Sequence, residues 1–93
     1  MIMGNKEIFE LAGKLQKKAQ RNLPIIKTMV DEVIAKRITN QVEIEHTLDT
    51  LLDYALLDVG KEEFERLNRY YKSVNKHNAD FYWHHYRDLL DLE

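Results

Sequence analysis

Glycine and proline are rare in this chain, which contains three glycines and one proline among 93 residues. These residues mark most tight turns, so their scarcity predicts few turns and long regular elements. It argues against a β-sandwich, a barrel or a glycine-rich phosphate loop. The length is that of a single domain, 1–93. The absence of cysteine excludes disulfides, thiolate metal sites and cysteine nucleophiles.

Apolar residues recur at intervals of three and four along the whole chain, which predicts helices and no strands. We expect four helices, at about 5–21, 23–38, 41–58 and 61–91. Because the connections are short, consecutive helices should be antiparallel neighbours. The predicted fold class is therefore all-α, an up-down antiparallel bundle of four helices.

The break between the first two helices is placed at Asn22, since Asn is a preferred cap and Pro24 is tolerated in the first turn of a helix. A single kinked helix over 5–38 is the alternative, because the apolar stripe continues through Ile26 and Val33. Further along, Asn40 and Glu43 resemble a capping box, and Gly60 is the expected carboxyl-terminal cap of the third helix.

The last helix, 61–91, is predicted to be long and aromatic-rich, since no glycine or proline interrupts it. Seven of its residues recur at alternating intervals of three and four, as in the seam of a coiled coil: Phe64, Leu67, Tyr71, Val74, Asn78, Phe81 and His85. A helix of this length exceeds its predicted neighbours, so its far end should pack on a second copy. A break between Asn75 and Asn78 remains open, and it would remove this reason for a dimer.

Seven of the nine aromatic residues lie between Phe64 and Tyr86, on more than one helix face. Aromatic, partly polar surface is typical of protein interfaces. We therefore expect a non-catalytic interaction module that self-associates as a dimer and needs no cofactor. The predicted interface residues are Phe81, Tyr82, Trp83, His85, Tyr86 and Leu89. A thick local core with tyrosine hydroxyls reaching water is the alternative interpretation of the same cluster.

A metal-dependent hydrolase is one alternative function. The candidate ligands share one stripe of the last helix at spacings of three and four: His77, Asp80, His84 and Asp88. Further ligands would have to come from a facing helix, where His46, Asp49 and Asp53 are available. The favoured interpretation is that His84 faces solvent or an interface and that Asp80 and Asp88 make ordinary i,i+4 pairs, since neither an EXXH nor an HEXXH motif is present.

A second carboxylate pattern, ExxE followed by DxxD, is formed by Glu62, Glu65, Asp88 and Asp91. All-α nucleotide pyrophosphohydrolases bind magnesium through carboxylates at this spacing on antiparallel helices. On one continuous helix the two pairs would lie roughly 35 Å apart, too far to share an ion. The two pairs could share an ion only if the helix breaks between them or if a dimer brings them together.

Weak nucleic-acid binding is the other alternative function. Its candidate residues are Arg66, Arg69, Lys72 and Lys76 with Tyr70. A separate basic segment of Lys14, Lys17, Lys18 and Arg21 is interpreted as an ordinary solvated helix face, with a binding stripe as the alternative. The net charge of −2 disfavours this function. The charge is uneven, because residues 1–40 carry eight basic and four acidic residues, and residues 41–93 carry six and twelve. No long apolar run indicates a membrane helix or a signal peptide, so a cytoplasmic protein is expected.

Overall fold

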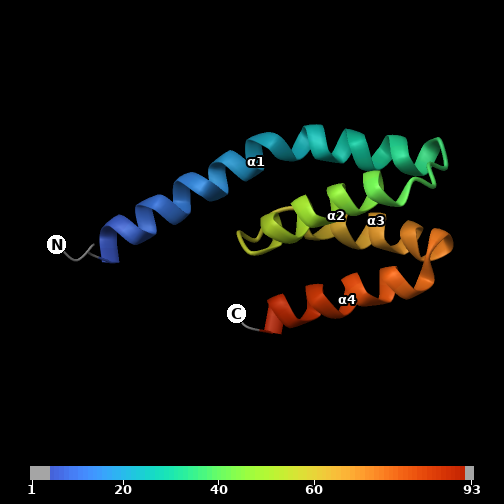
Figure 1. Cartoon of the computed structure of the whole chain (residues 1–93). Coiled ribbons are helices and arrows are strands. Elements are labelled where there is room, and N and C mark those ends of the chain that lie inside the picture. Colours follow the sequence, from blue (N-terminus) through green and yellow to red (C-terminus); the bar gives the residue numbers. More distant parts are fainter. Residues whose placement is uncertain (1–4, 92–93) are drawn as a thin grey trace.

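The computed structural model describes residues 5–91, with side chains from Glu7 onward, and these residues form four helices and no strand. The helices are α1 (Asn5–Ala35), α2 (Gln41–Ala55), α3 (Lys61–Val74) and α4 (Lys76–Asp91). The α2 and α3 helices pack side by side in the centre, with α1 on one side and α4 on the other (Figure 1). Both outer helices contact α2 and α3 but not each other. The prediction of an all-α up-down antiparallel bundle of four helices is confirmed.

The predicted break at Asn22 is wrong, because α1 runs without interruption through Pro24. Proline removes one backbone donor and crowds the preceding turn, which bends a helix but need not end it. Burial on the carboxyl-terminal side offsets this cost, since Val30 and Val33 are almost fully enclosed. The helix bends in its middle (Figure 1). The alternative of one kinked helix therefore describes this segment, with its end at Ala35.

The predicted continuous helix 61–91 is also wrong, because Asn75 ends α3 and α4 begins at Lys76. The backbone of Asn75 is extended, with φ −150° and ψ 91°. Its side-chain Oδ1 accepts a hydrogen bond from the backbone N–H of Asn78, which is a helix-starting cap. The break left open between Asn75 and Asn78 is the one that forms. The final helix folds back on the bundle, so its excess length no longer calls for a second copy.

The break also changes which residues face inward. The continuous seam placed Phe81 beside Phe64 and Tyr71, but Phe81 is 67% exposed while the other two are fully buried. After the break, α4 directs Ala79, Tyr82 and Tyr86 toward the bundle, at spacings of three and four. The Phe64 and Tyr86 rings stack with centroids 4.4 Å apart.

Gly60 was expected to cap the end of the third predicted helix, but it precedes α3 as its amino-terminal cap residue, with φ +75°. The helix before it ends at Ala55 in a Schellman motif, in which Asp58 takes the left-handed conformation and the N–H of Val59 donates to the carbonyl of Tyr54. Arg37 occupies the same position after α1, where the N–H of Ile38 donates to the carbonyl of Val33. The expected Asn40 cap is confirmed, since its Oδ1 accepts from the N–H of Glu43 at 3.1 Å.

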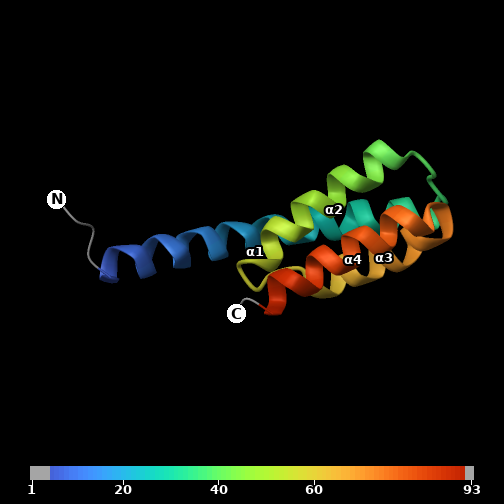
Figure 2. The ribbon, with the colours of Figure 1, turned by 60° about the horizontal axis from the view of Figure 1, so that its bottom comes forward.

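The core lies among α2, α3, the second half of α1 and the inward face of α4. Its largest fully buried side chains are Val30, Ile44, Leu48, Leu51, Phe64, Leu67 and Tyr71. Residues 7–15 of α1 contribute no buried side chain to this core. At 31 residues α1 is about 46 Å long, roughly twice the length of α2. Its first half extends beyond the other helices in both views (Figures 1 and 2). The radius of gyration is accordingly 14.9 Å, against about 12 Å for a compact domain of this length.

Candidate interaction surfaces

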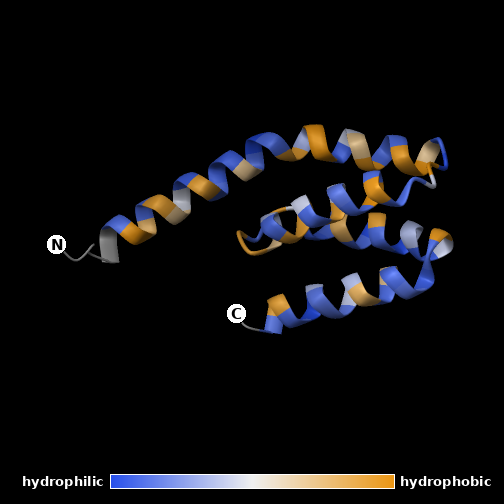
Figure 3. Ribbon diagram, viewed as in Figure 1, coloured by the Kyte–Doolittle hydropathy of each residue, from blue (hydrophilic) through white to orange (hydrophobic). Residues whose placement is uncertain are grey.

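The projecting part of α1, which we call the α1 arm (residues 7–15), carries an exposed apolar stripe. Ile8, Leu11 and Leu15 follow one face of the helix, and each is about half exposed. Phe9, beside the stripe, is 74% exposed. Figure 3 shows apolar residues continuing along α1 into its first half. An amphipathic face without a partner is a common feature of interaction sites.

The stripe reaches the bundle at the base of the arm. Ala19 is buried there, and the side-chain amide of Gln16 donates to the carbonyl of Leu57 at 3.0 Å. A hollow of about 220 Å³ lies beside this contact. It is lined by Leu15, Lys18, Ala19, Asn22, Asp53, Tyr54 and Leu57. The lining is mainly apolar, so the hollow suits an aliphatic side chain.

The predicted interface residues of the last helix are divided by the fold. Phe81, Trp83 and His85 are exposed, and Phe81, His85 and Leu89 line a shallow groove on the outer side of α4. Tyr86, in contrast, is 2% exposed and belongs to the core of the chain itself. Tyr82 and Leu89 are partly buried against that core. The outer face of α4 therefore offers a smaller apolar surface than the sequence predicts.

The candidate metal ligands do not converge in the described part of the chain. His77, His84 and Asp88 are exposed on α4, and Asp80 faces the Lys72 ammonium at 3.9 Å. Asp49, on the facing helix, accepts a hydrogen bond from Tyr82 instead. No group of three or more histidine, aspartate and glutamate side chains within the described residues could hold a metal ion. Within the described residues the ExxE and DxxD carboxylates form no such group either, although the break at Asn75 makes α3 and α4 antiparallel.

Two carboxylates of α2 instead hold tyrosines of the neighbouring helices. Tyr71 donates to Glu45 Oε2, and Asn78 Nδ2 donates to the same oxygen at 3.0 Å. One turn further along, Tyr82 donates to Asp49 Oδ1 at 2.8 Å. Burial, with the hydrogen bond to Glu45, raises the pKa of the Tyr71 hydroxyl. Burial, with the hydrogen bond to Asp49, raises the pKa of the Tyr82 hydroxyl well above its usual range. Both hydroxyls therefore act as donors that join the helices.

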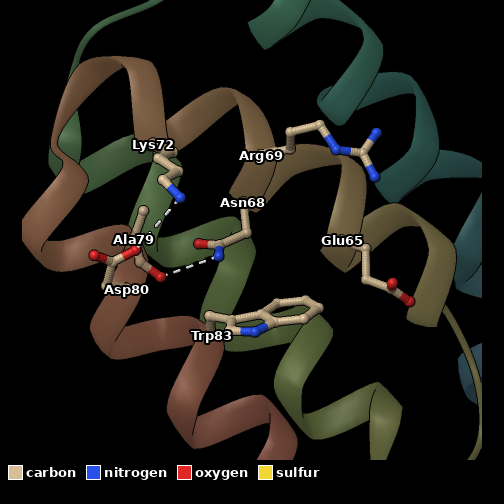
Figure 4. A pocket seen from close by; sticks show the side chains of 7 residues that line it. All are labelled: Glu65, Asn68, Arg69, Lys72, Ala79, Asp80 and Trp83. Atoms are coloured by element: carbon tan, nitrogen blue, oxygen red, sulfur yellow. Dashed lines mark hydrogen bonds and ion pairs between the residues drawn. The ribbon is translucent and has the colours of Figure 1, made fainter.

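A pocket of about 190 Å³ lies between α3 and α4 (Figure 4). Its walls are Glu65, Asn68, Arg69, Lys72, Ala79, Asp80 and Trp83. Asn68 is 5% exposed, and its Nδ2 donates to the carbonyl of Ala79 at 3.0 Å. Its Oδ1 is buried and has no hydrogen-bond partner among the described residues. An unpaired buried acceptor costs about 1–3 kcal/mol, so this amide marks the pocket as a place where a donor is missing.

The candidate nucleic-acid stripe is broken up by internal contacts. Arg66 pairs with Asp31 of α1, and the hydroxyl of Tyr70 donates to the carbonyl of Ile38 at 2.7 Å. Arg69 and Lys72 line the pocket just described, while Lys76 is exposed at the start of α4. A row of free cations beside an exposed aromatic ring, as single-strand binding requires, is not formed by these residues.

Asn68 was missed by reasoning from the sequence, although a signal was present. It follows Phe64 by four residues and precedes Tyr71 by three, so it shares their buried face. A polar residue at such a position predicts a buried amide that needs partners. The α1 arm was missed because the break at Asn22 was expected to end the helix before its length became apparent.

Comparisons with protein-family models, with curated proteins and with solved structures found no match to this chain. None of the helices within residues 5–91 combines the length and the apolar composition needed to cross a membrane. The candidate surfaces are therefore argued from their own geometry.

Proposed function

We propose that the chain is a non-catalytic interaction module that binds a second copy of itself through the α1 arm. The observation that carries this proposal is the exposed stripe of Ile8, Leu11 and Leu15 on a helix that extends past its bundle. A helix that is amphipathic but unpartnered gains stability by burying its apolar face. The expected partner is an identical arm, because the stripe is self-complementary when two helices run antiparallel.

The register of the antiparallel pair follows from the stripe. With the two-fold axis between Leu11 and Ala12, Ile8 of one arm lies opposite Leu15 of the other. Ile8 then lies beside the apolar hollow formed by Leu15, Tyr54 and Leu57 at the base of the partner arm. The hollow gives the aliphatic side chain an enclosed contact that the arms alone would lack.

Charge supports the same register. Glu7, Lys14 and Lys18 lie on one flank of the apolar stripe, at positions that face the equivalent flank in an antiparallel pair. Glu7 of one copy then lies between Lys14 and Lys18 of the other. A parallel pair would set this flank against the opposite flank of the partner, where the uncharged Ala12 and Gln16 lie, so the attraction would be lost.

Sedimentation of the purified protein over a range of micromolar concentrations tests the proposal. We expect a concentration-dependent dimer for the natural chain and a monomer for Leu11→Glu, which buries a charge in the pair. Phe81→Glu is the matched control, since it makes the same kind of change on the outer face of α4. A dimer that survives Leu11→Glu but is lost in Phe81→Glu would place the interface on α4, and a strict monomer would refute self-association.

A further inference from the structure

The pocket between α3 and α4 has charged walls of both signs. Arg69 and Lys72 supply two cations, and Glu65 and Asp80 supply two anions. At about 190 Å³ the pocket is smaller than the ~300–1,000 Å³ of sites for drug-sized ligands, so it suits a small molecule. A ligand of one sign would meet like charge on part of this wall, whereas a ligand carrying both signs would not.

The buried amide of Asn68 requires a donor in this pocket. Its orientation is settled by the Ala79 carbonyl, an acceptor that only the Nδ2 end of the amide can satisfy. The Oδ1 end is therefore the one without a partner. In Figure 4 this oxygen points toward the space between Lys72 and Asp80. A ligand that enters between these two side chains can bring an N–H donor to it.

The Lys72–Asp80 ion pair is the weakest contact of the pocket wall. Nζ and Oδ1 are 3.9 Å apart, and both side chains are about half exposed. An exposed pair at this distance contributes little to stability, so a ligand can replace it at low cost. The remaining wall is the indole of Trp83, which lies below Asn68 in Figure 4 and offers an apolar ring face.

We infer that this pocket binds a small zwitterion of the α-amino acid class with a flat apolar side chain. The carboxylate binds Lys72, and the ammonium group donates to Asp80 and to the unpaired Oδ1 of Asn68. The side chain of the ligand lies on the Trp83 ring. The site lies between α3 and α4 and includes no residue of α1, so the inference is independent of self-association through the arm.

Trp83 is the only tryptophan of the chain, so its indole N–H gives a single nuclear magnetic resonance signal from the pocket wall. Titration with L-phenylalanine is the direct test, and we expect a saturating shift of that signal in the millimolar range. Two analogues separate the charges: 3-phenylpropanoate lacks the ammonium group and phenethylamine lacks the carboxylate. Each should bind about tenfold more weakly than L-phenylalanine, since each loses charged hydrogen bonds.

Variants complete the test. Lys72→Gln and Asp80→Asn should each weaken binding of L-phenylalanine about tenfold, with unchanged helicity by circular dichroism. Lys17→Gln, a matched change on the remote α1 helix, should have no effect. Equal affinity for all three compounds would mean simple contact with an exposed ring, and would overturn the inference. So would a signal that does not saturate, or a Lys72→Gln protein that binds as the natural one does.

Discussion

The Oδ1 atom of Asn75 accepts a hydrogen bond of 3.0 Å from the backbone N–H of Asn78, and with this contact α4 begins. The same residue ends α3, where its own N–H donates to the carbonyl of Tyr71 at 2.8 Å. Its Nδ2 donates to Gln41 on α2 at 2.9 Å. One asparagine thus stops a helix, starts the next and holds the turn against the bundle.

Replacing Asn75 with alanine should lower the free energy of unfolding by about 1–2 kcal/mol, the usual cost of losing such a cap. Urea denaturation followed by circular dichroism measures this difference. His77→Ala, an exposed change two residues away, is the control and should stay within about 0.5 kcal/mol of the natural protein. Equal stability of the two variants would show that the cap is dispensable.

Phe64 and Phe81 should differ sharply when each is cut back to alanine. Phe64 is fully buried and stacked on Tyr86, so Phe64→Ala should cost about 3–5 kcal/mol of unfolding free energy. Phe81 is exposed, and Phe81→Ala should cost less than about 0.5 kcal/mol. Thermal denaturation ranks the two. A large loss of unfolding free energy in Phe81→Ala would instead support the continuous helix 61–91, in which Phe81 faces inward.

Pro24→Ala should raise the free energy of unfolding, because alanine restores a backbone donor and removes the clash with the preceding turn. The gain is expected to be about 1–3 kcal/mol in this helix interior. Ile25→Ala, on the exposed side of the same turn, serves as the control and should change little. If Pro24→Ala gives no gain, the bend of α1 must itself be needed for packing.

Alkaline pH should destabilise the bundle through Tyr82. Its folded pKa is raised by burial and by the hydrogen bond to Asp49, whereas an unfolded tyrosine titrates near its ordinary value of about 10. The protonated hydroxyl therefore contributes stability below about pH 10, and this contribution is lost as the pH rises above that value. The natural protein should lose more unfolding free energy between about pH 9 and pH 11 than Tyr82→Phe. Parallel pH profiles from urea denaturation would contradict this.

A charge exchange on the α1 arm tests the antiparallel register. Glu7→Lys should weaken dimerisation at low salt, since it sets like charges across the pair, and Lys14→Glu together with Lys18→Glu should do the same. The triple variant with all three changes should recover the dimer, because the attraction is restored with reversed sign. Sedimentation in low and high salt measures this. Failure of the triple variant to recover would mean that these flanks do not meet.

The boundaries of the helices were only partly predictable. The apolar spacing of three and four and the Asn40 cap indicated helices that the structure contains. At Asn22, however, local preference pointed the wrong way, because Pro24 was expected to start a helix and lies inside one. At Asn75 the break was left open, and a continuous helix was preferred because no glycine or proline interrupts 61–91. Cap preferences of about 1 kcal/mol are small enough for packing to reverse them.

By itself the sequence determined that the chain is helical and that its helices run up and down, since these properties depend on local spacing and short connections. The tertiary structure decided which helix is too long for its neighbours, and which aromatic residues lie inside. Both depend on where each helix turns back, and that is set by the burial of Val30, Val33 and Tyr86 against segments distant in the sequence. Periodicity specifies a helix face, but only packing against a partner specifies where that face is used.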